Sequence, residues 1–256
     1  MHAPGITSLL LALMLATSIA SCVDVADAPE PVGARIDTSF GDPARLLLDL
    51  ARTQDDLPLG WELDENKGKV AVLAADASLP ASSSWLRIVG KDGDRALEFS
   101  CKDGSFSLNR DVSDLDLGDF PVLEWTWRAS KLPTGADLRE SKKNDQVLQV
   151  LVQFGGMTKR VISYVWDTTA PVGTTATESY AFGSYTVKVV CVQSGEDELG
   201  RWTTVRRNLA EDYRELFGSK KFSRPRGVRI QTNSQYTASE SAGAFRAVIF
   251  EAEPRR

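Results

Sequence analysis

Two short runs of alternating residues contain the side chains best suited to binding a polar ligand. One run places Glu124 and Arg128 on the same face of an extended strand, and the other does the same for Gln149 and Gln153. Charged groups and amides form the hydrogen bonds that hold sugar hydroxyls or carboxylated polymers. If the two polar faces adjoin, these four residues line one binding surface. The alternative is a solvated sheet face, which is the usual meaning of polar alternation.

The opposite face of the first run contains two tryptophans, Trp125 and Trp127. Flat indole rings can stack on sugar rings, but large aromatic side chains also dominate protein cores. Leu123 is in phase with both indoles, so the pattern favours a buried position.

Four aspartates in the segment RDVSDLDLGDF could supply hard oxygen ligands, of which calcium takes six to eight. They are Asp111, Asp114, Asp116 and Asp119. Their spacing does not match the calcium loop D-x-[DN]-x-[DN]-G. The alternative is an inter-strand loop in which the aspartates form turns. Calcium is the one cofactor that the sequence suggests.

The chain has three cysteines, and Cys101 and Cys191 remain once Cys22 is assigned to the leader. Two cysteines in an oxidising compartment can form a disulfide. Cys101 is in phase with Leu97 and Phe99, so it is expected to face the core. A pair of buried free thiols is the alternative, and the sequence leaves both open.

The composition excludes several function classes. The one histidine, His2, lies in the leader, so catalysis by Ser-His-Asp or Cys-His sets and histidine metal sites are excluded for the remainder. A formal net charge of −5 argues against a nucleic-acid partner. We find no P-loop, GxGxxG, GxSxG or CxxC motif. Catalysis by a carboxylate pair is the one remaining enzymatic route, and the sequence favours a protein that is not an enzyme.

Residues 1–21 have the features of a signal peptide. The segment from Ile6 to Ala20 is 15 residues long and uncharged, shorter than the roughly 20 apolar residues of a membrane-spanning helix. The residues that end the leader, Ile19-Ala20-Ser21, resemble the bacterial lipoprotein signal, in which the next residue, Cys22, is lipidated. An ordinary secretory signal is the alternative.

Lipidation of Cys22 predicts a membrane partner and a location in the cell envelope, because two or more acyl chains anchor a protein stably. Val23 favours the outer membrane, with the protein facing the periplasm. Residues 22–41 are rich in Ala, Asp, Pro and Gly. They are expected to form a flexible tether with a reach of roughly 25 Å, followed by one domain over 42–256.

Most of that domain is expected to be β-strand. Ten runs have period-2 alternation or strong β propensity, separated by turn residues. They are Trp85–Val89, Ala96–Cys101, Ser105–Leu108, Val122–Ala129, Gln146–Phe154, Arg160–Trp166, Tyr185–Gln193, Trp202–Arg207, Gly227–Thr232 and Ala244–Phe250. Many short strands with few helices predict a mostly β fold, a two-layer antiparallel β-sandwich.

Two short helices are expected beside the strands. The first begins at Asp42-Pro43 and uses the leucines of 46–50 as its apolar side. The second runs from Leu209 to Phe217, with Asn208 as its N-cap and Gly218 as its C-terminal stop.

Several blocks between residues 58 and 252 resemble a family of secreted bacterial proteins known only as a domain of unknown function. The blocks are FPVLEWTWR at 120–128, LP at 132–133, GADLR at 135–139, Asp145, FGG at 154–156, YVW at 164–166, SG at 194–195, LGRW at 199–202, RRN at 206–208, EDY at 211–213 and LFG at 216–218. The resemblance implies a jelly-roll-like sandwich of the kind found in carbohydrate-binding modules, and no activity. It also implies acidic residues near the last strands, where this chain has QTNSQ at 231–235.

Together these features predict an exported lipoprotein that binds cell-envelope or extracellular polysaccharide without catalysis. The alternative is a structural or assembly protein of the envelope that binds protein partners. A carboxylate-dependent polysaccharide enzyme is the third and least favoured hypothesis.

Overall fold

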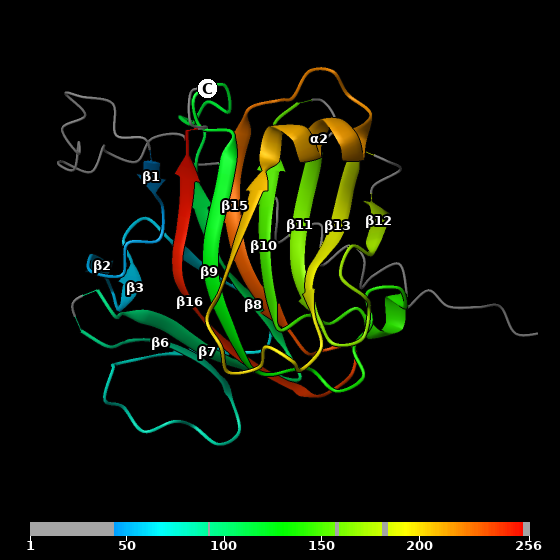
Figure 1. Cartoon of the computed structure of the whole chain (residues 1–256). Coiled ribbons are helices and arrows are strands. Elements are labelled where there is room, and N and C mark those ends of the chain that lie inside the picture. Colours follow the sequence, from blue (N-terminus) through cyan, green and yellow to red (C-terminus); the bar gives the residue numbers. More distant parts are fainter. Residues whose placement is uncertain (1–43, 92, 157–158, 181–183, 253–256) are drawn as a thin grey trace, which may run out of the picture.

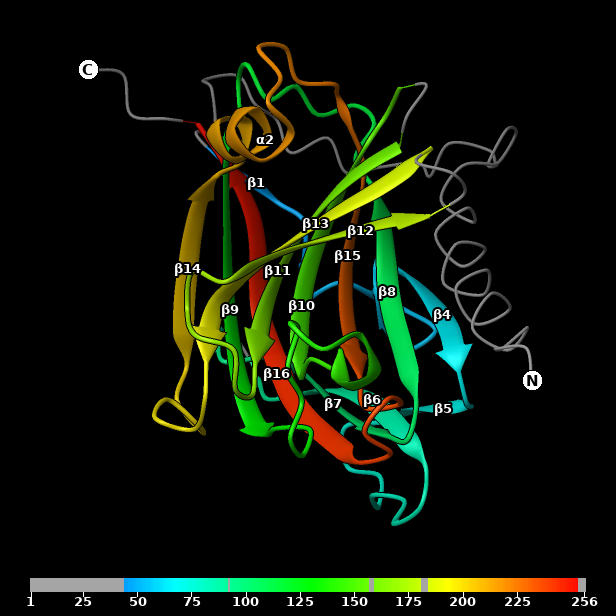
Figure 2. The ribbon, with the colours of Figure 1, turned by 90° about the vertical axis from the view of Figure 1, so that its right-hand side faces the viewer.

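Two seven-stranded sheets pack face to face and enclose the main core (Figures 1 and 2). A computed structural model describes residues 44–252 except 92, 157–158 and 181–183. Sheet 1 has the order β14-β9-β16-β7-β6-β5, with β1 paired to the end of β16. Sheet 2 has the order β12-β13-β11-β10-β15-β8-β4, and β2 and β3 form a separate ribbon. The pairs are antiparallel except for β5 with β6 and β11 with β13.

The strands of sheet 1 are β1 (Ala44–Leu46), β5 (Val70–Leu73), β6 (Ser84–Val89), β7 (Ala96–Lys102), β9 (Val122–Lys131), β14 (Thr203–Asn208) and β16 (Glu240–Glu251). Those of sheet 2 are β4 (Glu62–Lys67), β8 (Ser105–Asp111), β10 (Leu148–Phe154), β11 (Lys159–Asp167), β12 (Thr175–Tyr180), β13 (Tyr185–Ser194) and β15 (Pro225–Asn233). The ribbon is β2 (Thr53–Gln54) and β3 (Leu57–Pro58), and the short 3-10 helix η1 is Ser141–Lys143.

Aromatic side chains fill the space between the sheets. Trp125 and Trp127 on β9 have no exposed surface, which confirms that they belong to the core. Trp125 packs on Tyr164 of sheet 2 with ring centroids 5.1 Å apart, and Trp127 packs on Trp166 at 6.1 Å. The Trp127 indole N–H also donates to Gln193 Oε1 at 2.9 Å, so its polar atom is satisfied inside the core.

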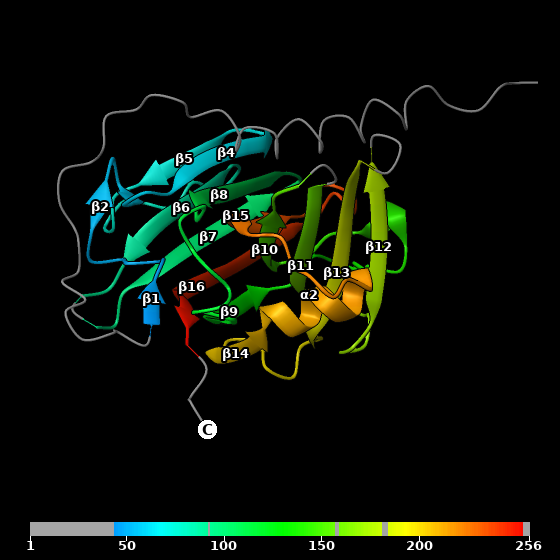
Figure 3. The ribbon, with the colours of Figure 1, turned by 90° about the horizontal axis from the view of Figure 1, so that it is seen from above.

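The helix α2 (Leu209–Phe217) lies across one end of the sandwich (Figure 3). Asn208 caps it by accepting the Glu211 N–H at 3.1 Å, and Gly218 ends it in the left-handed region with φ of 59°. Tyr213 lies on the buried face of the helix, with its ring centroid 4.6 Å from that of Phe154. The helix that the sequence predicted here is confirmed.

The other predicted helix, from Asp42-Pro43, is wrong. Ala44–Leu46 is the strand β1, paired with β16, and Leu47 and Leu48 continue by donating their N–H groups to Val248 O. A single short helix is marginal by itself, whereas the free edge of β16 offers this segment backbone partners. Leu47, Leu48 and Leu50 bury against the core, whereas Leu46 is exposed. Within the described residues, α2 is the one α-helix.

All ten predicted strands are present, so the mostly β, two-layer sandwich is confirmed. The additional strands β4, β5 and β12 lie at the outer edges of the two sheets. Residues 1–21, Cys22 and the tether over 22–41 lie outside the described residues. Within the part of the chain that the structure describes, no helix has the length and apolarity to cross a membrane.

Candidate functional site

The outer face of sheet 2 is hollowed into a groove, which we call the amide groove. The groove is open to solvent, and the region that it spans, solvent included, measures about 680 Å³. Alternation along β10 turns Val150 and Val152 into the core and leaves Gln149 and Leu151 on the outer face. Seven of the lining side chains are amides: Asn66, Asn144, Gln146, Gln149, Gln231, Asn233 and Gln235. Each amide offers both donors and an acceptor.

Asn233 organises the centre of this groove. Its Oδ1 accepts from Gln149 Nε2 at 2.7 Å and from the backbone N–H of Gln146 at 2.9 Å. Its Nδ2 donates to the backbone oxygen of Asn144 and to Asp145 Oδ1, each at 3.0 Å. The network fixes which edge of the Asn233 amide accepts and which donates, and it holds Gln149 in one orientation.

Asp145 lies beneath the network with no exposed surface. Beyond Asn233, its carboxylate accepts the backbone N–H groups of Tyr236 and Thr237 at 3.2 and 2.7 Å and the Thr237 hydroxyl at 2.8 Å. A buried carboxylate with this many donors is satisfied by the protein alone. Asp145 therefore fixes the turn after β15, which carries Gln235 and Tyr236 into the groove.

A buried guanidinium marks the far side of the groove. Arg229 is 6% exposed, and it donates to Asn109 Oδ1 at 2.6 Å and to Gln231 Oε1 at 3.5 Å. It also pairs with Asp64 on β4 at 3.5 Å. Burial raises the pKa of Asp64, and Arg229 partly opposes that rise. The positive charge is thus shared among protein groups.

Two groups line the side of the groove near β12. Glu178 accepts from Asn144 Nδ2. Tyr236 is half-buried, and burial together with the charges of Glu178 and Asp145 raises its phenol pKa. Tyr236 therefore keeps its hydroxyl proton at ordinary pH and remains a hydrogen-bond donor.

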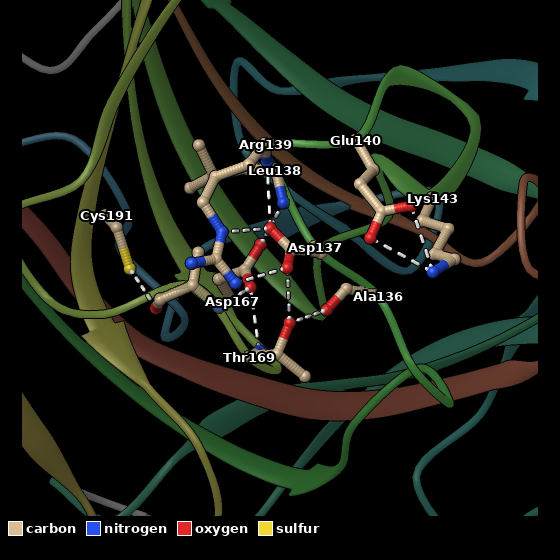
Figure 4. Close-up of polar contacts among 10 residues, drawn as sticks. Ala136, Asp137, Leu138, Arg139, Glu140, Lys143, Asp167, Thr169 and Cys191 are labelled. Atoms are coloured by element: carbon tan, nitrogen blue, oxygen red, sulfur yellow. Dashed lines mark hydrogen bonds and ion pairs between the residues drawn. The ribbon is translucent and has the colours of Figure 1, made fainter.

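The segment from Leu132 to Gln146, which we call the wall, contributes Asn144 and Gln146 to the groove. Asp137 and Asp167 fasten it to the end of β11 and the residues that follow (Figure 4). Asp167 has no exposed surface and accepts the backbone N–H groups of Leu138, Thr169 and Ala170 at 2.7–2.9 Å. Thr169 also joins the wall through its hydroxyl, which donates to Ala136 O at 2.9 Å.

The two aspartates differ in their pKa shifts. Burial raises the pKa of Asp167, although its three backbone donors lower it. The Arg139 guanidinium holds the pKa of the neighbouring Asp137 well below its usual range. Since Asp145 holds the other end of the segment, the wall is set in place by the protein before any ligand arrives.

A second, smaller hollow adjoins the amide groove on the same face and shares Leu151 and Arg229 with it. Gln153, Val161 and Tyr185 contribute side chains to it. Gly227 lies directly opposite Gln153 across β10 and β15 and has no side chain to occupy the space between them. We call this the small hollow.

The expectation that four polar residues form one surface is wrong. Gln149 and Gln153 lie on the outer face of sheet 2, but Glu124 and Arg128 lie on β9 in sheet 1, whose inner face packs against the inner face of sheet 2. Arg128 donates to Glu98 at 3.3 Å and stacks on Trp202, with its guanidinium 4.7 Å from the ring centroid. Glu124 lies 3.9 Å from Arg206.

The four aspartates considered for calcium do not come together as a metal site. Asp111 accepts from the backbone and side chain of Ser113, and Asp116 accepts from Gly118 N–H and Arg224. Asp114 pairs with Arg45, and Asp119 contributes a backbone turn bond to Asp116. Within the described residues, no group of three or more His, Cys, Asp or Glu side chains could hold a metal ion.

Cys101 and Cys191 are free thiols, so the disulfide alternative is wrong. Cys101 faces the core from β7 in sheet 1, as its phase predicted. Cys191 lies on the outer face of sheet 2 in a second apolar cluster with Leu138 and Val189. The two cysteines thus belong to different sheets and opposite sides of sheet 2. Burial raises the pKa of each thiol to about 11.

Most of the amide groove was missed by the sequence predictions. Gln231 and Asn233 share a strand face by alternation, and this signal is present in the sequence as QTNSQ. Asn66, Asn144 and Gln146 lie in an irregular edge strand and a loop, where alternation gives no direction.

Several solved structures share a similar arrangement of strands with this chain, at low similarity. The family 11 carbohydrate-binding module of a cellulosomal cellulase from Clostridium thermocellum is 9% identical, with a TM-score of 0.42, over 83% of this chain and 96% of that chain. The xylan-binding CBM22-1 domain of Paenibacillus barcinonensis Xyn10C is 8% identical, with a TM-score of 0.39, over 84% and 100%. The xyloglucanase domain of NopAA from Sinorhizobium fredii is 9% identical, with a TM-score of 0.38, over 75% and 94%. Scores this low do not carry a functional argument.

No curated protein sequence matches the chain. A family profile does match it, over residues 77–249, which is more than half of the chain. That stretch includes most strands of both sheets and most of the amide groove, and it covers the blocks from FPVLEWTWR to LFG. The chain therefore belongs to the family described as "Protein of unknown function (DUF3047)".

Proposed function

We propose that the protein binds a polysaccharide in the amide groove without catalysing a reaction. The observation that carries this proposal is the convergence of seven amide side chains and Tyr236 around one groove on the outer face of sheet 2. Sugar hydroxyls both donate and accept hydrogen bonds, and amides match them on both counts. The groove is also held in shape by Asp145 and Asp167 before binding, which lowers the entropic cost of association.

The carboxylates of this face support binding rather than hydrolysis. Asp64 lies on β4 and Glu178 on β12, at opposite edges of sheet 2. The strand order therefore does not pair them, whereas the two carboxyl groups of a glycosidase act as a pair about 5–9.5 Å apart. Asp145 lies nearer the centre but is fully buried, and its oxygens are occupied by four donors.

The binding test is calorimetric titration of the purified protein with a panel of soluble neutral and anionic polysaccharide fragments. Saturable binding of a fragment is expected, and the double variant Gln149→Ala/Gln231→Ala should weaken it at least tenfold, because each lost hydrogen bond contributes about 1 kcal/mol. Gln54→Ala, an exposed amide in β2, is the matched control. Absence of saturable binding across the panel would overturn the proposal, as would equal affinities of the double variant and the control.

We also propose that the chain is an envelope lipoprotein, anchored through Cys22 and set off from the membrane by residues 23–41. The support is the uncharged leader and the Ile19-Ala20-Ser21 ending before the cysteine. Metabolic labelling with a fatty acid should mark the native chain and not Cys22→Ser. Secretion of an unlabelled native chain would instead indicate an ordinary signal peptide. Fractionation of the labelled protein between inner and outer membranes tests the prediction that it lies in the outer membrane.

A further inference from the structure

The outer face of sheet 2, along the small hollow and the adjoining part of the amide groove, contains two polar atoms that the described residues leave without partners. Gln153 is 7% exposed, and among the described residues nothing bonds to its buried Oε1. Ser163, which lines the adjoining amide groove, is 2% exposed, and its buried Oγ likewise has no partner within the described chain. Buried polar atoms are nearly always hydrogen-bonded, so two such atoms on one outer face indicate where a ligand bonds.

The register places these two atoms on either side of an apolar floor. Gln153 pairs with Val161 and Leu151 pairs with Ser163, so Gln153 and Ser163 are diagonal neighbours across β10 and β11. Diagonal neighbours on one face lie roughly 7–8 Å apart. Leu151 and Val161 occupy the other two corners, and Tyr185 closes one side. Gln153 thus supplies an acceptor oxygen and Ser163 a hydroxyl donor at diagonal positions, with the aliphatic side chains of Leu151 and Val161 at the other two.

We propose that the small hollow, together with Ser163 at the adjoining edge of the amide groove, is a subsite for the acetamido group of an N-acetylated sugar, which rests on the saccharide-binding function proposed above. A secondary amide presents its N–H and its C=O on opposite edges. The N–H would donate to Gln153 Oε1, and the C=O would accept from Ser163 Oγ. The methyl group would lie against Leu151 and Val161, where a polar substituent would lose its water without compensation. The space opposite Gln153 exists because residue 227 is glycine.

The same geometry discriminates against related sugars. A plain hydroxyl in place of the acetamido group is too short to reach both Gln153 and Ser163, and it leaves the aliphatic floor uncovered. A free ammonium, as in a deacetylated sugar, brings a positive charge to a hollow that Arg229 also lines. The ligand class is therefore an N-acetylhexosamine polymer, whose neighbouring sugar units extend past Leu151 into the amide groove.

The test is a comparison of three tetrasaccharides that share β-1,4 linkage: chitotetraose, its deacetylated form and cellotetraose. Chitotetraose should bind the purified protein at least tenfold more tightly than either of the others, from one added methyl contact and a second hydrogen bond. Equal affinities would overturn the acetamido subsite and leave the binding function intact. If none of the three binds and the wider panel is also silent, the binding function fails as well.

Substitutions around the small hollow test whether the acetamido group binds there. Ser163→Ala and Gln153→Leu should each reduce the preference for chitotetraose over cellotetraose severalfold, and Gly227→Val should reduce it by filling the hollow. Gly227 is not among the glycines with positive φ, so the backbone accepts a side chain there. Gln231→Ala, in the amide groove, should weaken both ligands equally. A preference that survives Ser163→Ala, Gln153→Leu and Gly227→Val would place the acetamido contact elsewhere and overturn the proposal.

A fourth ligand distinguishes the two sources of such polymers. A tetrasaccharide of alternating N-acetylglucosamine and N-acetylmuramic acid has the same acetamido groups as chitotetraose, with added lactyl carboxylates. Binding at least as tight as that of chitotetraose would assign a bacterial wall glycan, and tenfold weaker binding would assign a chitin-like polymer. Either result supports the acetamido subsite, provided that cellotetraose remains the weaker ligand.

Discussion

Asn233 donates its Nδ2–H to Asp145 Oδ1 at 3.0 Å, and both residues are buried, Asn233 in the lining of the amide groove and Asp145 beneath it. The bond joins the last strand of sheet 2 to the segment that enters β10, which are far apart in sequence. Through Asn233, the same contact orients Gln149. The groove is thus built on a buried carboxylate that does not itself face the ligand, and the stability of the fold and the shape of the site depend on the same pair.

Replacing Asp145 with Asn should destabilise the protein strongly. The variant amide has one acceptor oxygen for four donors, and its NH2 group would face the Tyr236 or Thr237 N–H. We expect a loss of about 3 kcal/mol in the free energy of unfolding, a fall in Tm of roughly 6–12 °C for a chain of this size. Asp103→Asn is the control, because its exposed pair with Lys67 contributes under about 1 kcal/mol. Similar Tm values for the two variants would contradict this role of Asp145.

Glu240 should contribute to stability at neutral pH and lose that contribution in acid. Lys131 and Lys102 flank it on the two neighbouring strands and lower the pKa of its carboxyl to about 2. A carboxyl with a depressed folded pKa stabilises the protein above its unfolded pKa, near 4.5, and the effect is lost as pH falls through about 2. The Tm difference between the native chain and Glu240→Gln should therefore shrink from pH 5 to pH 2.

Glu240 and its two lysine partners are partly exposed, so 1 M NaCl should reduce the Tm difference between the native chain and Glu240→Gln at pH 5. A Tm difference that stays constant from pH 2 to pH 6 would show that the carboxylate charge is not what Glu240 contributes.

The two thiols should react only when the protein unfolds. With pKa values of about 11, the thiolate fraction at pH 8 is about 100-fold below that of a thiol whose pKa is 9, and both sulfurs are also buried. Peptide mapping after iodoacetamide treatment should find residues 101 and 191 unmodified in native protein and fully modified in 6 M guanidinium without reductant. Failure to label them in guanidinium would indicate a disulfide and contradict the structure.

Arg128→Ala should affect packing on sheet 1 and leave ligand binding unchanged. Arg128 and Arg246 hold their guanidinium groups 4.7 and 4.2 Å from the Trp202 ring centroid, and Arg128 also pairs with Glu98. Removal of one cation–π contact and one half-exposed ion pair should cost about 1 kcal/mol, measured by Tm. Calorimetric titration with the fragment bound by the native chain should give the same affinity. A tenfold loss of affinity would move the site to sheet 1.

The alternation of side chains was enough to predict much of the fold. It placed ten strands, it put Trp125 and Trp127 in the core, and it turned Gln149 and Gln153 to the outside. The helix over Leu209–Phe217 was also predictable from local signals, because Asn208 begins it and Gly218 ends it through bonds to residues three and four positions away. Local signals failed at the sheet edges. The strand β4 reads ELDENK and has no apolar alternation because it borders solvent, and the leucines of 46–50 were interpreted as a helix although β16 pairs with that segment.

The candidate site was decided by tertiary structure. Alternation tells which side of its own strand a residue occupies, but it does not tell which strands become neighbours. The strands β9 and β10 follow one another in the chain, yet they lie in opposite sheets, so Arg128 and Gln149 face away from each other. The true neighbours of β10 are β11 and β15. Gln149 and Asn233, 84 residues apart, meet only because that pairing buries the apolar faces of both strands. The groove follows from this long-range pairing.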